Sequence, residues 1–236
     1  MSATFSFNGD KSILSVDIFP PIYLKEEDEF VLGLINFETF NAIPNVDKDN
    51  NVFHVGGKEI VIPVGAYELT NINEYLQKQL EKLSYHDKHF KCILSLTGNV
   101  NTLKCEIECT HEIDFTVPNS IGPLLGFSNK TKLVPNQWHI SPLPVNILKI
   151  NSIRVLCNIV QGSYDNGIAS HLIHEFFPEV FPGYKIIETP QNVIYLPINT
   201  KIIRNITVQI VDQSGKLINF QGETITLRLH LKKVNN

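Results

Sequence analysis

The chain has 236 residues, of which 43% are hydrophobic and 19% are charged, with a formal net charge of -4. This length can bury a sizeable core in one large all-β domain or in two small ones, and the composition is that of a folded globular protein. Because the chain has no excess of basic residues, the composition argues against a nucleic-acid-binding module.

The N-terminal sequence, MSATFSFNGDKSI, contains no apolar core of signal-peptide length. No uncharged run in the chain is long enough to span a membrane as a helix. We therefore expect a protein that is soluble and intracellular, in the cytoplasm or nucleus, when it is made. Residues 1–20 are a polar start and an extended piece that ends at Pro20-Pro21, and we expect them to form an N-terminal arm.

The next elements alternate between strands and turns. A charge run at 25–29 is typical of a solvated turn, and the sequence predicts a strand at 30–37 after it. Residues 52–64 predict a hairpin around Gly56-Gly57, because two glycines suit the positive φ angles of a two-residue hairpin turn.

At residues 70–83 the apolar residues change from the spacing of a strand to the spacing of a helix. The sequence there is TNINEYLQKQLEKL. Thr70 or Asn71 can act as its N-cap, because short polar side chains bond to the free N–H groups of the first turn. The segment predicts one amphipathic helix with apolar residues at helical spacing: Ile72, Leu76, Leu80 and Leu83.

Further strands are predicted at 90–97, 102–109 and 113–117, and a long one at 147–160. Two segments rich in Pro, Gly and Asn predict long surface loops at 128–144 and 161–183. In the last quarter, residues 206–211 and 223–231 alternate strictly between apolar and polar side chains, which predicts half-buried antiparallel strands. These elements predict an all-β fold, an antiparallel jelly-roll β-sandwich with one inserted helix and long end loops, in a single domain at 21–236.

No residue pattern predicts a cofactor or catalytic site. The four cysteines are too few for a disulfide framework, and Cys105 and Cys109 would lie about 13 Å apart on one face of a strand. We therefore expect buried free thiols. His171 and His174 with Glu175 lack the order of a zinc protease motif and a third ligand.

Two further polar groups could supply oxygen ligands for calcium, but a structural interpretation is favoured for both: Asp165 with Asn166, and Asp47 with Asp49 and Asn50. Asp47, Asp49 and Asn50 lack the glycine and distal glutamate of a calcium loop, so we expect a polar turn without metal. Serine-hydrolase and phosphate-loop patterns are also missing, and we expect no enzyme activity. We therefore predict no catalytic, metal-binding or cofactor-binding residues.

The two long predicted loops contain aromatic residues, as interface anchors often do. They are candidates for protein–protein contacts, with the alternative that they cap the open end of the monomer's own sandwich. The candidate interface residues are Trp138, Tyr164, Phe176, Phe177, Phe181 and Tyr184.

Five blocks of the chain carry a resemblance to a known family. They are IPVGAYELTNINEYLQKQL (62–80), SIGPLLGF (120–127), INSIRVLCNIVQGSYDNG (150–167), HLIHEFFPEVFPGYKIIE (171–188) and VDQSGKLINFQGETITLRLHL (211–231). Together they resemble the minor capsid protein, or penton, of Polintons (Mavericks) and adintoviruses, which is a single jelly-roll protein. The resemblance covers most of the chain beyond about residue 30, and its two C-terminal blocks are the most specific.

This resemblance implies a structural protein of the virion. The chain would form a homopentamer at the fivefold vertices of an icosahedral capsid, in contact with a double jelly-roll major capsid protein. A host receptor is a further partner that the resemblance leaves open. The alternative from a different class is a jelly-roll, lectin-like module that binds a ligand or receptor through its end loops.

Overall fold

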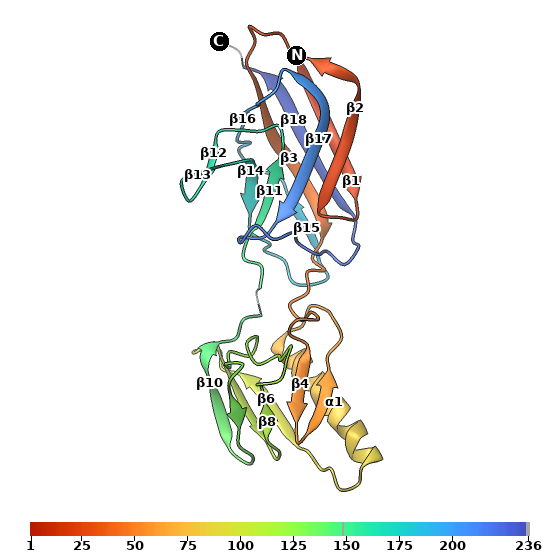
Figure 1. Ribbon diagram of the computed structural model, residues 1–236, viewed down its shortest axis with the longest axis vertical. Coiled ribbons are helices and arrows are strands. Elements are labelled where there is room, and N and C mark those ends of the chain that lie inside the picture. The colour runs from red at the N-terminus through yellow and green to blue at the C-terminus, as the bar shows by residue number, and fades with distance from the viewer. Residues whose placement is uncertain (148, 235–236) are drawn as a thin grey trace. The chain divides into compact units, whose positions relative to one another are not determined.

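The computed structural model describes residues 1–147 and 149–234. The chain divides into two compact units, of which unit 1 comprises Met1–Ile43 and Ile150–Asn236, and unit 2 comprises Pro44–Lys149. Unit 2 is therefore an insertion between two segments of unit 1 (Figure 1). The sequence predicts one domain at 21–236, whereas the structure has two compact units. The insertion has the same apolar and polar patterning as unit 1 and no flexible linker composition, so the sequence does not mark its boundaries.

Unit 1 is a sandwich of two antiparallel sheets. The first has the order β1 (Ser2–Gly9), β18 (Ile225–Lys233), β3 (Phe30–Phe40) and β15 (Lys185–Glu188), with β16 (Leu196–Pro197) also paired to β3. The second has the order β14 (Leu172–Phe176), β11 (Ile153–Cys157), β17 (Ile202–Val211) and β2 (Ile13–Tyr23). A separate hairpin joins β12 (Ser163–Asp165) to β13 (Ile168–Ser170). The predicted all-β, antiparallel jelly-roll class is confirmed.

The core of unit 1 lies between these sheets and follows from the period-two pattern. In β18, four alternating side chains are buried, as the sequence predicts: Ile225, Leu227, Leu229 and Leu231. Strand β17 contributes three more in the same way: Ile206, Val208 and Ile210. The two strands follow each other in sequence but belong to opposite sheets, so each brings its apolar face to the same core.

The first residues of the chain are part of this sandwich. Strand β1 pairs along its whole length with β18, from Ser2 opposite Lys232 to Gly9 opposite Ile225. Phe5 and Phe7 of β1 are buried in the core. The expected N-terminal arm at 1–20 is therefore wrong: alternation of Phe5 and Phe7 with polar residues is a strand pattern, and the N–H of Lys233 at the end of β18 donates to the carbonyl oxygen of Met1.

Unit 2 contains two small sheets and the helix. One sheet has the order β10 (Trp138–Pro144), β7 (Lys104–Cys109) and β6 (Leu94–Gly98). The other has the order β5 (Lys58–Val61), β4 (Val52–Val55), β8 (Ile113–Asp114) and β9 (Lys132–Leu133). The predicted turn at Gly56-Gly57 joins β4 to β5, with φ angles of 55° and 73°. Position 126 requires glycine, because a Cβ atom there would collide with the carbonyl oxygen of Leu143.

The predicted helix is present as α1 (Leu69–His86). It buries Ile72, Leu76 and Leu80, three of the four residues that its pattern placed inside. Glu68, rather than Thr70 or Asn71, is the N-cap, and the side chain of Asn71 accepts a hydrogen bond from the Glu68 N–H at 3.1 Å. Among the described residues, no helix is long and apolar enough to cross a membrane.

The two predicted long loops contain strands. Segment 128–144 includes β9 and β10, and segment 161–183 includes β12, β13 and β14. Pro142 and Pro144 argue against a strand in the sequence. Strand β10 nevertheless tolerates them, because it lies at the edge of its sheet and only one side of it needs backbone donors. The predicted long strand at 147–160 is shorter, since β11 covers only Ile153–Cys157.

Candidate interaction surfaces

The structure separates the six candidate interface residues into two kinds. Five side chains are half or more exposed: Trp138, Tyr164, Phe177, Phe181 and Tyr184. Trp138 belongs to unit 2 and the others to unit 1, so they form more than one surface. None of the five is needed for the core of its unit, and we treat them as candidate contact residues.

Phe176 differs from the other five candidates, because it is a core residue of unit 1 and is not exposed for contact with a partner. It is 6% exposed, and its ring lies 5.1 Å from the ring of Phe37. In the register of β14 with β11, Phe176 lies opposite the buried Ile153. It therefore points between the sheets, whereas its neighbour Phe177 is past the strand and points to solvent.

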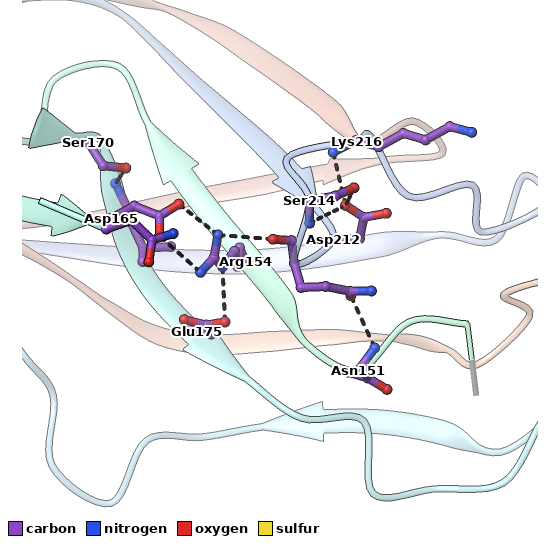
Figure 2. Close-up of polar contacts among 11 residues, drawn as sticks. Asn151, Arg154, Asp165, Ser170, Glu175, Asp212, Ser214 and Lys216 are labelled. Atoms are coloured by element: carbon purple, nitrogen blue, oxygen red, sulfur yellow. Dashed lines mark hydrogen bonds and ion pairs between the residues drawn. The ribbon is translucent and has the colours of Figure 1, made fainter. Parts of the chain in front are cut away.

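The hairpin β12–β13 presents Tyr164 on an ordered support. Asn166 and Gly167 form its turn with φ angles of 48° and 82°, which suits a two-residue connection with positive φ at both positions. Asp165 and Tyr164 are successive strand residues and so point to opposite faces of the hairpin. Asp165 faces Arg154 of β11 (Figure 2). Tyr164 is left on the outer face and is 71% exposed.

Arg154 is the centre of a polar network that fixes this hairpin. Its Nε donates to Oε1 of Glu175 at 2.9 Å, and its Nη1 donates to Oδ2 of Asp165 at 2.9 Å (Figure 2). Nη2 donates to Oδ1 of Asp165 at 3.4 Å, and Nη1 also reaches the carbonyl oxygen of Gln213 at 3.4 Å. A planar guanidinium between two carboxylates is a geometry that lysine cannot reproduce.

Hydrogen bonds and charges in this network shift the pKa values of Arg154 and Glu175. The hydrogen bond to Glu175 is the main cause that raises the pKa of Arg154. Burial alone would raise the pKa of Glu175, but hydrogen bonds and the positive charge of Arg154 hold it below its ordinary value. Both groups are therefore ionised at neutral pH, and Arg154 can position the hairpin through charge-assisted hydrogen bonds.

The connection between β14 and β15 carries Phe177, Phe181 and Tyr184, and buried Asn41 holds it in place. The N–H of Asn41 donates to the carbonyl oxygen of Tyr184 at 2.8 Å, and its Nδ2 donates to that of Val180 at 2.7 Å. Because the backbone is fixed in this way, the exposed aromatic rings stand on an ordered loop. This lowers the conformational entropy that a partner would have to remove on binding.

Unit 2 carries its exposed apolar residues on β10. Trp138, Ile140 and Leu143 are 53%, 62% and 65% exposed. Strand β10 is an edge strand, paired only to β7, and its register is irregular between Ile140 and Pro144. An apolar edge strand is a surface that other chains can pair with or cover.

Sequence reasoning missed a further set of exposed residues on β2. Phe19, Tyr23 and Ile13 are 94%, 68% and 45% exposed, and β2 is the edge of its sheet. Ile13 and Phe19 lie in segment 1–20, which was expected to form an arm, and Tyr23 lies three residues beyond it. A large apolar residue directly before Pro20-Pro21 is the signal that could have drawn attention to this segment.

The polar groups that resembled metal sites have other partners. His171 and His174 come from an extended segment and not from a helix: His171 Nδ1 contacts the carbonyl oxygen of Val160 at 2.6 Å, and His174 Nε2 contacts Glu188 Oε1 at 2.9 Å. Asp47 pairs with Lys149, and its Oδ1 accepts from the N–H of Asp49 at 3.0 Å. Within residues 1–147 and 149–234, no three His, Cys, Asp or Glu gather as metal ligands.

One end of unit 1 has a pocket of about 400 Å³, with apolar side chains from Leu24, Phe30 and Ile198 in its lining. The ammonium group of Lys201, also in the lining, donates to the carbonyl oxygens of Glu26 and Asp28 at 3.1 and 2.9 Å. Lys201 therefore stabilises the turn before β3.

Comparison with known proteins gives a structural match and no sequence match. No protein-family model matches the chain, and no curated protein matches it significantly. The crystal structure of the selenomethionine-labelled mavirus penton protein is similar, with a TM-score of 0.53 and 12% sequence identity. The alignment covers 99% of this chain and 99% of the mavirus chain, and so includes residues of both units. The chain therefore has the fold of a penton protein.

Proposed function

We propose that this chain is a penton, a minor capsid protein that forms the fivefold vertices of an icosahedral shell as a homopentamer. The observation that carries the proposal is the end-to-end structural similarity to the mavirus penton protein. A shared jelly roll alone would be weak support, because this fold has many functions. Here the similarity extends over the insertion as well, and five blocks of the sequence resemble the minor capsid protein of Polintons and adintoviruses.

The two flanks of unit 1 support a ring. One flank has β14, the hairpin β12–β13 and the connection that carries Phe181 and Tyr184, and the other flank has β1 and β2 (Figure 1). A fivefold ring needs a heterologous contact, in which one surface of a copy binds a different surface of the next. We assign Tyr164, Phe177, Phe181 and Tyr184 to one side of this contact and Phe19 and Tyr23 to the other.

A penton also needs a contact with the shell. In the proposed assembly the neighbour is a double jelly-roll major capsid protein, and the role of this chain is structural and without catalysis. The apolar edge strand β10 in unit 2 is available for a further protein contact, either to this neighbour, to the next copy or to a host receptor.

Assembly with the major capsid protein tests the proposal. The two proteins would be co-expressed, and the particles imaged by electron cryomicroscopy with icosahedral averaging. We expect density for five copies of this chain at each vertex. Shells that close with major capsid protein alone, and from which this chain is absent, would contradict the proposal.

Matched variants test the flank assignment in the same assay. Phe181→Ser and Phe19→Ser should each lower the occupancy of the vertices, because each removes an exposed aromatic anchor from one side of the contact. Tyr85→Ser is the control, since Tyr85 is 83% exposed but lies on α1 of unit 2. Equal occupancy in all three variants would contradict the assignment. Binding of a small ligand in the pocket beside Lys201, by a protein that ignores capsid shells, would favour the lectin-like module.

A further inference from the structure

Two of the four cysteines lie in contact with each other. The Sγ atoms of Cys92 and Cys109 are 3.3 Å apart, although 17 residues separate them in sequence. Cys109 is the last residue of β7, and Cys92 lies two residues before the start of β6. All four cysteines are free thiols in this structure.

The register of β6 and β7 explains why these two thiols meet. Leu94 lies opposite Cys109, so Cys92, two residues earlier, is on the same face and diagonal to Cys109. The N–H of Thr110 donates to the carbonyl oxygen of Ile93, and the N–H of Ile93 donates to Oγ1 of Thr110, both at 3.0 Å. These two bonds join Ile93 to Thr110 and so hold the two segments together next to the thiol pair.

The thiol of Cys109 differs from the other three in its pKa, since the hydrogen bond with Cys109 and burial raise the pKa of Cys92. A hydrogen bond from Cys92, helped by the backbone N–H of His111, lowers the pKa of Cys109 to about 7, against the effect of burial. Burial raises the pKa of Cys105 to about 12 and that of Cys157 to about 11. Cys92 is only partly buried, which gives a small oxidant access to the pair. Cys109 is itself buried, so an oxidant has to approach its thiolate from the side of Cys92. The thiolate is the form of cysteine that oxidants attack.

We propose that Cys92 and Cys109 form a redox-controlled cross-link site, which is a dithiol in reducing surroundings and closes to a disulfide when a peroxide is present. The proposal rests on the geometry of unit 2 and does not depend on the proposed function. Closure would tie the segment before β6 to the end of β7 and so restrict the unfolded chain, which stabilises the folded unit. Only a small movement of the two sulfur atoms is needed, because Cys92 lies outside the hydrogen-bonded strand.

The reaction balances with one peroxide molecule. The thiolate of Cys109 attacks a peroxide oxygen, the O–O bond breaks, and the products are a sulfenic acid on Cys109 and a hydroxide that takes up a proton to become water. The sulfur of Cys92 then attacks Sγ of Cys109, the S–O bond breaks, and the proton of Cys92 leaves with the oxygen as a second water. Two electrons pass from the two thiols to the peroxide.

Thiol counting on the full chain tests the proposal. The reduced protein would be freed of reductant, treated with hydrogen peroxide, denatured and alkylated, and its thiols counted by mass spectrometry. We expect the four thiols to fall to two, with Cys92 and Cys109 in one cross-linked peptide. Dithiothreitol should restore all four, and the oxidised protein should have a thermal midpoint at least several degrees higher.

Single substitutions provide the controls. Cys92→Ser and Cys109→Ser should each abolish the cross-link, and Cys105→Ser and Cys157→Ser should each keep it. Recovery of four free thiols from the peroxide-treated wild type would overturn the proposal. It would also be overturned by a sulfinic acid on one cysteine with the other still free, or by a disulfide between two chains. Because the first measurement uses the wild type, a variant that fails to fold leaves the test intact.

Discussion

Two neighbouring phenylalanines show how one residue step decides a side chain's role. Phe176 is buried against Phe37 and Phe177 is exposed. From the sequence the two are equivalent, because both stand in a segment rich in aromatics, proline and glycine. The pairing of β14 with β11 places Phe176 opposite Ile153 and so turns it inward. The register also shifts between Val155 and Leu156, so a strict alternation cannot be read along this strand from the sequence.

Alanine substitution distinguishes the two residues. Phe176→Ala should destabilise unit 1 by about 3–4 kcal/mol, because it leaves a cavity between the sheets. Phe177→Ala should change the free energy of unfolding by less than about 0.5 kcal/mol. Chemical denaturation followed by fluorescence measures both values. Similar losses for the two variants would show that the assignment of the core face is wrong.

The pH dependence of stability tests the charges around Arg154. The folded protein lowers the pKa of Glu175, so ionised Glu175 contributes stability above its ordinary pKa of 4.5. That contribution is lost as the pH falls through the lowered value. Glu175→Gln should therefore be less stable than the wild type at neutral pH, and the two should converge in acid. Glu27→Gln, at an exposed position, is the control and should run parallel to the wild type. Thermal melts across this pH range would reject the account if Glu175→Gln also ran parallel.

At the scale of elements, the hairpin β12–β13 depends on Arg154. Arg154→Gln removes the bonds to both Asp165 and Glu175, and should cost about 1–2 kcal/mol because the arginine is largely buried. Limited proteolysis should then cut near the Asn166-Gly167 turn at a higher rate. Arg204→Gln is the matched control, since Arg204 is exposed on β17. If Arg204→Gln gave equal proteolysis, the hairpin would not depend on the network.

Strand β10 gives a second prediction at this scale. Trp138→Ala should leave the thermal midpoint unchanged within about 2 °C, because the indole is half exposed on an edge strand. The same variant should reduce incorporation into capsids, because it removes a large apolar contact from unit 2. Loss of cooperative unfolding in the variant would instead place Trp138 in the core.

The elements also show which parts of the fold the sequence can predict. The helix could be predicted because its apolar residues repeat at helical spacing over more than two turns. The last two strands could be predicted because apolar and polar residues alternate in each over six or more residues. The shorter strands were missed, since β9, β12 and β13 are too short to show any period. The cap of α1 was misplaced by two to three residues because Asn71 bonds backward to Glu68 from inside the helix.

At the scale of the whole molecule, the division into two units was not predicted. The chain leaves unit 1 after Ile43 and returns at Ile150, and both crossings are ordinary loop sequence without a glycine- or serine-rich linker. Five of the six candidate interface aromatics are exposed and Phe176 is buried, so their role in contacts stays a prediction. Phe19 and Tyr23 were missed because the pairing of β2 with β17 joins residues far apart in sequence.

The mass of the protein in solution tests the central proposal most directly. Light scattering on a sizing column would be run on the purified chain, alone and with the major capsid protein added. A penton should give either a species of five chains of 26.7 kDa, about 134 kDa, or a smaller species that moves into particles when the capsid protein is present. A monomer or dimer that ignores the capsid protein in both runs would contradict the proposal.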